Sequence, residues 1–260
     1  MTIEWSWTGA ALFGVGMVAG FVDAIAGGGG LLTVPALLSA GLPPQVALGT
    51  NKLQSTCGTA LATWNYARAG LLPWRRWWPG ILVTFVAAMA GTMAVTRLDP
   101  GWLRRVIPIV LGLVAVYTAF KPDLGTGARP ARMGTLPFAL VFGMLLGFYD
   151  GFFGPGTGSF WMVACVVLQG LDLRGATGVT KAMNLTSNIA SLGWFMAAGT
   201  VHFGIGLVMA AGQVIGASLG SRLAIKGGAR VIRPVFLVVV LALAAKLAWE
   251  AMTLKVASGR

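Results

Sequence analysis

Charged side chains are scarce in this sequence. Lys, Arg, Asp and Glu make up 10% of the 260 residues, only seven residues are acidic, and there is one histidine. Hydrophobic residues make up 57% of the chain, and the mean hydropathy is +0.80. One soluble core cannot bury that much apolar surface. The composition therefore argues against a soluble domain and predicts an all-α polytopic membrane protein.

Cysteine and histidine are too few for the common metal and redox motifs. Cys57 and Cys165 lie far apart in apolar runs and match no CxxC spacing, so we expect both to pack as small hydrophobic residues. His202 lies at a predicted loop or helix start and has no acidic neighbour in the sequence. Because there is no HExxH motif and no nucleophile–base cluster, we expect no metal site, no cofactor and no enzyme.

Basic residues outnumber acidic ones and give a net charge of +12. Most of them fall in short loops between apolar runs, so they indicate topology signals and lipid-headgroup contacts in a bilayer, not a nucleic-acid surface. The loops on alternate sides carry equal numbers of basic residues, which leaves the orientation open. The N-terminus lacks the charged region and cleavage site of a secretory signal, so we expect the first apolar run to be retained as a helix.

Apolar runs of nearly bilayer-spanning length recur along the chain. About 20 residues are needed to cross a membrane as a helix. The predicted segments cover residues 7–26, 45–66, 77–96, 103–120, 136–153, 175–198, 203–221 and 231–252. We therefore expect about eight transmembrane segments in a multi-pass protein of a bacterial inner membrane. The sequence leaves open whether the chain forms a homo-oligomer.

The chain also repeats itself. Seven of the fourteen positions from 16 to 29 are identical 127 residues later, and shorter matches follow at offsets of 129 and 125. The repeat predicts two homologous halves, residues 1–120 and 135–260, joined by the Gly- and Pro-containing linker 121–134. Whether the halves run parallel or inverted is not determined by the repeat.

Each predicted half contains a glycine-rich break followed by a short apolar stretch. The first break is the run Gly27–Gly30, and the residues 31–40 after it are too few to span a bilayer. The second break contains Gly154, Pro155, Gly156, Thr157 and Gly158. A broken helix at membrane depth is tolerated only where protein or a water-filled cavity satisfies its backbone groups. Such breaks in corresponding positions are typical of the binding sites of secondary transporters.

Other glycines have the small-xxx-small spacing that lets two helices approach closely. They are Gly143, Gly147, Gly151, Gly212, Gly216 and Gly220. For these six we predict a packing role. For the four consecutive glycines of the first break we predict an open backbone close to a ligand, although a sharp turn without a ligand is the alternative.

Polar residues near the breaks suggest an anion site. A short helix that starts at a break directs free N–H groups and the positive end of its dipole toward an anion. Lys52 and Lys181, matched across the repeat, add positive charge; alternatively they reach the membrane interface or neutralise Asp23 and Asp150. The two aspartates are candidates for proton coupling. The candidate substrate-binding residues are Gly27, Gly28, Gly29, Gly30, Thr50, Asn51, Lys52, Gly154, Gly156, Thr157, Gly158, Thr180, Lys181 and Asn184.

The first half resembles a known family. The run GFVDAIAGGGGLLTVPALL (20–38), followed by GLPP (41–44) and ALGTNK (47–52), is similar to the signature of the sulfite exporter TauE/SafE family of membrane transporters. The second half carries a weaker copy and departs from it at Pro155, Thr157 and Thr180. The resemblance implies a duplicated permease for small sulfur-containing or carboxylated anions that works without ATP hydrolysis.

We therefore expect a secondary transporter, with the anion held between the two breaks. Export is the simpler direction, because a membrane potential of about 100 mV, negative inside, favours the exit of anions. The alternatives are a passive anion channel, an intramembrane enzyme, and a membrane partner subunit that binds without transporting.

Overall fold

A computed structural model describes residues 5–119, 127–232 and 234–235. Within these residues every regular element is a helix. The helices are α1 (Trp5–Ala26), α2 (Gly30–Ser39), α3 (Pro44–Arg68), α4 (Trp74–Thr96), α5 (Pro100–Ala119), α6 (Thr135–Phe152), α7 (Thr157–Gln169), α8 (Leu173–Ala197) and α9 (Phe203–Gly227). The all-α prediction is confirmed, including the two short helices that follow the glycine breaks.

Seven predicted segments coincide with helices to within a few residues, while most of the eighth, 231–252, lies outside the described residues. Four helices in the described part of the chain are both long and apolar enough to cross a membrane: α1, α4, α6 and α9. Helices α3 and α8 have 25 residues each, about 37 Å of helix, but carry more polar side chains.

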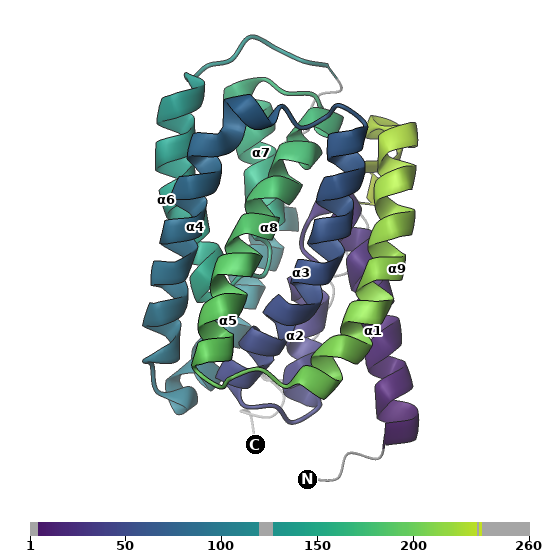
Figure 1. The fold of residues 1–260 in the computed structure, drawn as a ribbon, viewed down its shortest axis with the longest axis vertical. Coiled ribbons are helices and arrows are strands. Elements are labelled where there is room, and N and C mark those ends of the chain that lie inside the picture. The colour runs from purple at the N-terminus through teal and green to yellow at the C-terminus, as the bar shows by residue number, and fades with distance from the viewer. Residues whose placement is uncertain (1–4, 120–126, 233, 236–260) are drawn as a thin grey trace, which may run out of the picture.

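The two polar helices lie at the centre of the bundle. In Figure 1, α4 and α6 stand on one side, α1 and α9 on the other, and α3 and α8 run between them. This order follows from the sequence, because the apolar helices can face lipid on their outer sides and shield the polar helices from it. The aromatic part of the core packs beside α8, where Phe138 of α6 contacts Trp77 and Trp161.

Glycines fix the contacts between neighbouring apolar helices. Gly212, Gly216 and Gly220 of α9 lie against the backbone of α1, and Gly147 and Gly151 of α6 lie against the backbone of α4. At each of these positions an added Cβ atom would collide with a carbonyl group of the other helix. The packing role predicted for these five glycines is confirmed, and the sixth, Gly143, packs on the side chain of Val83 of α4.

These contacts also establish the direction of each helix. Phe13, Met17 and Phe21 of α1 face Gly212, Gly216 and Gly220 in the same order, so α1 and α9 are parallel. By the same reasoning α6 is parallel to α4. Helix α8 is antiparallel to α3, since Gly49 at the start of α3 lies beside Phe195, and Gly178 near the start of α8 lies beside Leu71.

Helices that match in sequence therefore run in opposite directions through the bundle. Figure 1 shows α1 and α3 rising where α6 and α8 descend. This arrangement is the inverted order that the sequence left open. The division into two halves joined by a linker at 121–134 remains a prediction, because residues 120–126 lie outside the described part of the chain.

Candidate functional site

Two helix breaks meet in the interior of the bundle. The first lies between α1 and α2, where Gly27 and Gly28 have φ angles of 75° and 98°. The second lies between α6 and α7, where Gly154 and Gly156 have φ angles of 87° and 84°. Glycine adopts this left-handed region without a steric penalty. Gly27 packs directly against Gly158, so a Cβ atom on either residue would collide with the other break.

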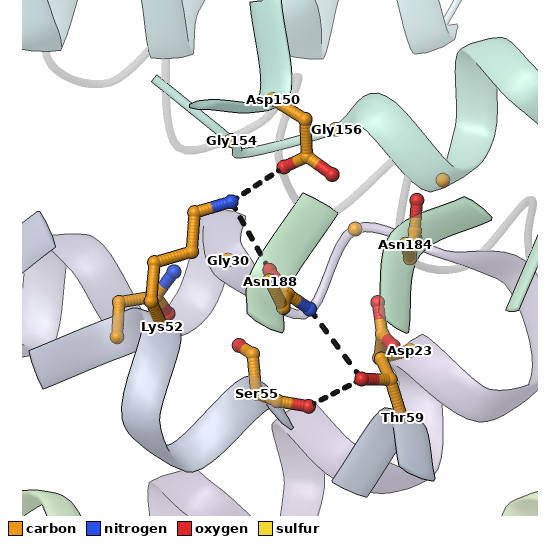
Figure 2. Close-up of a pocket in the computed structure, with 13 residues that line it drawn as sticks. Asp23, Gly30, Lys52, Ser55, Thr59, Asp150, Gly154, Gly156, Asn184 and Asn188 are labelled. Atoms are coloured by element: carbon orange, nitrogen blue, oxygen red, sulfur yellow. Dashed lines mark hydrogen bonds and ion pairs between the residues drawn. The ribbon is translucent and has the colours of Figure 1, made fainter. Parts of the chain in front are cut away.

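A small polar cavity lies beside the meeting point and has a volume of about 30 Å³. Both breaks and the central helices α3 and α8 contribute to its wall (Figure 2). Its lining residues are Asp23, Gly28, Gly30, Asn51, Lys52, Ser55, Thr59, Asp150, Gly154, Gly156, Gly158, Asn184 and Asn188.

Lys52 forms an ion pair on the cavity wall. Its ammonium group lies 2.8 Å from Asp150 Oδ1 and donates a second hydrogen bond, 3.0 Å long, to Asn188 Oδ1. Asn188 in turn donates to the hydroxyl of Thr59. Figure 2 shows the Lys52 side chain extended between Asp150 and Asn188. The other carboxylate oxygen of Asp150 accepts a hydrogen bond from Ser187.

Lys181 forms the second ion pair, with Asp23, which lines the cavity from α1. Its ammonium group lies 3.0 Å from Asp23 Oδ2 and also donates to the backbone carbonyl of Asp23. The Lys181 side chain is 0% exposed and is not part of the cavity wall. Asp23 Oδ1 accepts the backbone N–H of Gly29 at 3.3 Å. This pair therefore holds the end of α1 and the start of the first break.

The two ion pairs cross between the matched parts of the sequence. Lys52, from the first part, pairs with Asp150 of the second, and Lys181 pairs with Asp23 of the first. Both lysines are buried, which excludes the alternative that they reach the membrane interface. In the structure the two lysines neutralise the two aspartates. Removing one partner of a buried pair typically costs about 3–5 kcal/mol, because an uncompensated charge remains.

The structure brings most of the predicted site residues to the cavity. Ten residues of the predicted set line it: Asp23, Gly28, Gly30, Asn51, Lys52, Asp150, Gly154, Gly156, Gly158 and Asn184. Six do not: Gly27, Gly29, Thr50, Thr157, Thr180 and Lys181. Among these, Thr50 accepts a hydrogen bond from the backbone N–H of His202, and Thr157 and Thr180 donate to backbone carbonyls of their own segments.

His202 is the N-cap of α9, and its Nδ1 accepts a hydrogen bond from the backbone N–H of Ile205.

Sequence reasoning missed four residues at or beside the cavity: Ser55, Thr59, Ser187 and Asn188. A signal for three of them was available. Asn51, Ser55 and Thr59 are spaced four residues apart, as are Asn184 and Asn188, so each set lies on one helix face. Two polar stripes on central helices predict a shared polar space. Ser187 lies three residues after Asn184, on the same helix face, but its contact with Asp150 is visible only in the structure.

Hydrogen-bonding capacity remains open at the cavity. Within the described residues, the backbone N–H groups of Gly28 and Gly158 donate to no protein acceptor. The side-chain oxygen of Asn184 is buried and accepts no hydrogen bond there either. Asn51 is held in place from behind, because its Oδ1 accepts hydrogen bonds from Thr33 and Gln54. The cavity therefore offers N–H donors, one ammonium group and one free acceptor.

Side chains that commonly bind metal ions are not grouped in the described residues. In the part of the chain that the structure describes, no three His, Cys, Asp or Glu side chains come together as a cluster. The chemistry of the cavity is that of hydrogen bonds and buried ion pairs.

Comparison with known proteins places the chain in a family. The family described as "Sulfite exporter TauE/SafE" matches residues 12–247. A "Probable membrane transporter protein" of Haemophilus influenzae is 41% identical over 241 residues, covering 93% of this chain and 94% of the relative. The "Probable membrane transporter protein YfcA" of Escherichia coli K12 is 44% identical over 239 residues, covering 92% and 89%.

A third relative agrees. The "Probable membrane transporter protein ORF9" of a Sinorhizobium species is 42% identical over 238 residues, covering 92% of this chain and 91% of the relative. No solved structure matches the chain. The apolar helices and these relatives together identify an integral, multi-pass membrane protein. The chain belongs to the sulfite exporter TauE/SafE family of membrane transporters.

Proposed function

We propose that this protein is a secondary transporter that exports a small sulfur-containing oxyanion, such as sulfite or an organosulfonate, across a bacterial inner membrane. The anion binds in the cavity between the two helix breaks. One observation carries the proposal: a buried ammonium group, that of Lys52, lines a polar cavity beside two helix breaks with open backbone N–H groups. Helix starts and ammonium groups are well suited to oxyanions.

The size of the cavity implies that binding rearranges the ion pair. A volume of about 30 Å³ has room for about two water molecules, and a sulfonate group is larger. Lys52 already donates to Asp150 and Asn188. We therefore propose that the arriving anion replaces the Asp150 carboxylate as a partner of Lys52, and that the cavity widens as the two groups separate.

The remaining predicted residues have supporting roles in this proposal. Asn51 and Asn184 would donate amide hydrogen bonds to the anion, alongside the backbone of Gly28 and Gly158. The Lys181 side chain is fully buried, and its ammonium group is paired with Asp23. It would contact the anion only after the first break opens. Thr50, Thr157 and Thr180 hold backbone groups near the site.

The proposed direction rests on energetics. A potential of about 100 mV, negative inside, contributes roughly 2.3 kcal/mol for each charge that crosses. A dianion would leave with about 4.6 kcal/mol in its favour, whereas its uptake would need accompanying cations. Export is therefore the direction that needs the fewest partners.

The first test is anion binding to the purified protein. Sulfite, thiosulfate, sulfoacetate, taurine, sulfate and a monocarboxylate would be compared by thermal shift and calorimetry. We expect selective stabilisation by one of them and loss of that effect in Lys52→Ala. Because Lys52→Ala leaves Asp150 unpaired, the neutral double variant Lys52→Met/Asp150→Asn serves as a second variant that removes both charges together.

Reconstitution then separates a transporter from its alternatives. In proteoliposomes a carrier shows saturable counterflow of the labelled anion, which a passive channel lacks. If anions bind but never cross, the chain is a binding subunit and the transport proposal is wrong. If no anion binds to the folded wild-type protein, the anion site itself is refuted and an intramembrane enzyme or partner subunit becomes the better hypothesis.

A further inference from the structure

The carboxylates of Asp150 and Asp23 each accept a hydrogen bond from a lysine on one oxygen, but they differ in the group that donates a hydrogen bond to the other oxygen. Asp150 Oδ1 accepts from Lys52, and its Oδ2 accepts from the hydroxyl of Ser187. Asp23 Oδ2 accepts from Lys181, and its Oδ1 accepts from the backbone N–H of Gly29. A hydroxyl can donate or accept a hydrogen bond, whereas a backbone N–H can only donate. Of these two, only Asp150 has a neutral partner able to accept a hydrogen bond from a protonated carboxyl group.

Ser187 is placed to serve both protonation states of Asp150. Its Oγ also lies 3.0 Å from the backbone carbonyl of Asn184. A hydroxyl has one hydrogen. When Asp150 is ionised, this hydrogen points to Oδ2; when Asp150 is protonated, the carboxyl donates to Oγ and the serine hydrogen turns to the Asn184 carbonyl. The position 129 residues before Ser187 is Gly58, which has no side chain, so Asp23 lacks an equivalent partner.

The charges around Asp150 are balanced before an anion arrives. Lys52 faces it from α3, Asp23 of α1 lies on the same cavity wall, and Lys181 of α8 is paired to Asp23. Helix α7 contains no charged residue, and the arginines of α4 and α5 lie near the first turns of those helices. An anion therefore adds a negative charge that the described groups do not balance, and a buried charge without compensation is costly.

We propose, resting on the anion site above, that Asp150 takes up one proton when the anion replaces it beside Lys52, and that Asp23 does not. The proton is taken up from bulk solvent, which the buffer replenishes, and forms an O–H bond on the Asp150 carboxylate. This O–H donates a hydrogen bond to Ser187 Oγ, and the serine O–H, which stays intact, rotates to donate to the Asn184 carbonyl. Anion and proton then bind together. A monoanion would then cross without net charge and gain nothing from the membrane potential. A dianion would cross with one net charge and keep half of the contribution that the potential makes to its export.

The test measures protons together with anion binding. Methanesulfonate and thiosulfate are the probes, because neither titrates near neutral pH. Calorimetry of each in two buffers of different ionisation enthalpy gives the number of protons taken up. We expect about one proton per anion in the wild-type protein, and a dissociation constant that rises about tenfold for each unit of pH above neutrality.

Variants identify the group that takes the proton. Asp150→Asn should bind the anion with no proton uptake and no dependence on pH. Ser187→Ala should reduce uptake at a given pH, because the protonated carboxyl loses its acceptor. Ser191→Ala is the matched control: its hydroxyl is buried on the same helix and makes no hydrogen bond within the described residues, so uptake should equal that of wild type.

The outcomes separate this proposal from the one it rests on. Anion binding without proton uptake in wild type, or uptake that persists in Asp150→Asn, overturns the proton assignment and leaves the anion site intact. Failure of both probes and of the wider anion panel to bind overturns the anion site as well. If Asp150→Asn does not fold, the comparison of Ser187→Ala with Ser191→Ala tests the proposal, since both variants keep the Lys52–Asp150 ion pair. Equal proton uptake in these two variants overturns the proposal.

Discussion

The two ion pairs occupy matched positions in the sequence but have different surroundings. Lys52 and Asp150 lie on the wall of a cavity, with amide and hydroxyl groups around them. Lys181 and Asp23 are fixed to backbone groups, since Lys181 donates to the same carbonyl of Asp23 that accepts the N–H of Gly27. The Lys181 ammonium thus caps the C-terminal end of α1, where a positive charge is favourable. An internal repeat can duplicate a charge pair and still place the two copies in different surroundings, one at a helix end and the other among side-chain amides and hydroxyls.

The largest expected effect comes from removing the structural lysine. Lys181→Ala should lower the free energy of unfolding by about 3–5 kcal/mol, because Asp23 loses its partner and the C-terminal end of α1 loses its cap. Lys52→Ala should cost less, because Lys52 caps no helix end and its second acceptor is the side-chain amide of Asn188. Thermal melting of the two variants in detergent compares them directly. The double variant Lys181→Met/Asp23→Asn, which removes both charges, should recover part of the stability lost in Lys181→Ala. Equal destabilisation by Lys181→Ala and Lys52→Ala would mean that the two ion pairs contribute equally to stability.

The two helix breaks provide the next comparison. Both Gly27 and Gly154 have positive φ, so alanine at either position costs about 1–2 kcal/mol in backbone strain. Gly27→Ala should cost a further 1–3 kcal/mol, about the range for overpacking, because its Cβ atom would collide with the backbone of Gly158. At Gly154 the nearest atoms lie 3.2 Å or more from the added Cβ atom. Chemical denaturation should therefore rank Gly154→Ala as the more stable variant. The reverse order would mean that the close contact between Gly27 and Gly158 does not limit the size of the side chain at position 27.

The smallest expected effect separates two asparagines on one helix. Asn188→Ala should destabilise the fold by about 1–2 kcal/mol, since Lys52 and Thr59 each lose a buried hydrogen-bond partner. Asn184→Ala should be nearly neutral for stability, because its side-chain oxygen has no partner in the described residues, and should instead weaken anion binding. Melting and calorimetry on both variants test this. Asn184→Ala with unchanged anion affinity would exclude its amide from the site.

Much of this fold could be predicted from the sequence. The apolar runs, the short helices after the breaks and the close-packing glycines are local properties of composition and spacing, and the helices lie within a few residues of the expected segments. Most of the polar residues near the breaks reach the cavity. Ser187 could not be found this way, because nothing in its own neighbourhood distinguishes it from other serines in polar helices.

The sequence by itself determined that the chain is helical, that it belongs in a membrane, and that two glycine breaks interrupt it beside charged residues. These conclusions depend on hydrophobicity and backbone freedom, which each segment carries in its own residues. The tertiary structure alone decided that matched helices run in opposite directions, that each lysine pairs with the aspartate of the other part, and that only Lys52 faces the cavity. A buried charge must find a partner, but any of the opposite charges could serve, and only the packing of the helices selects which one lies within reach.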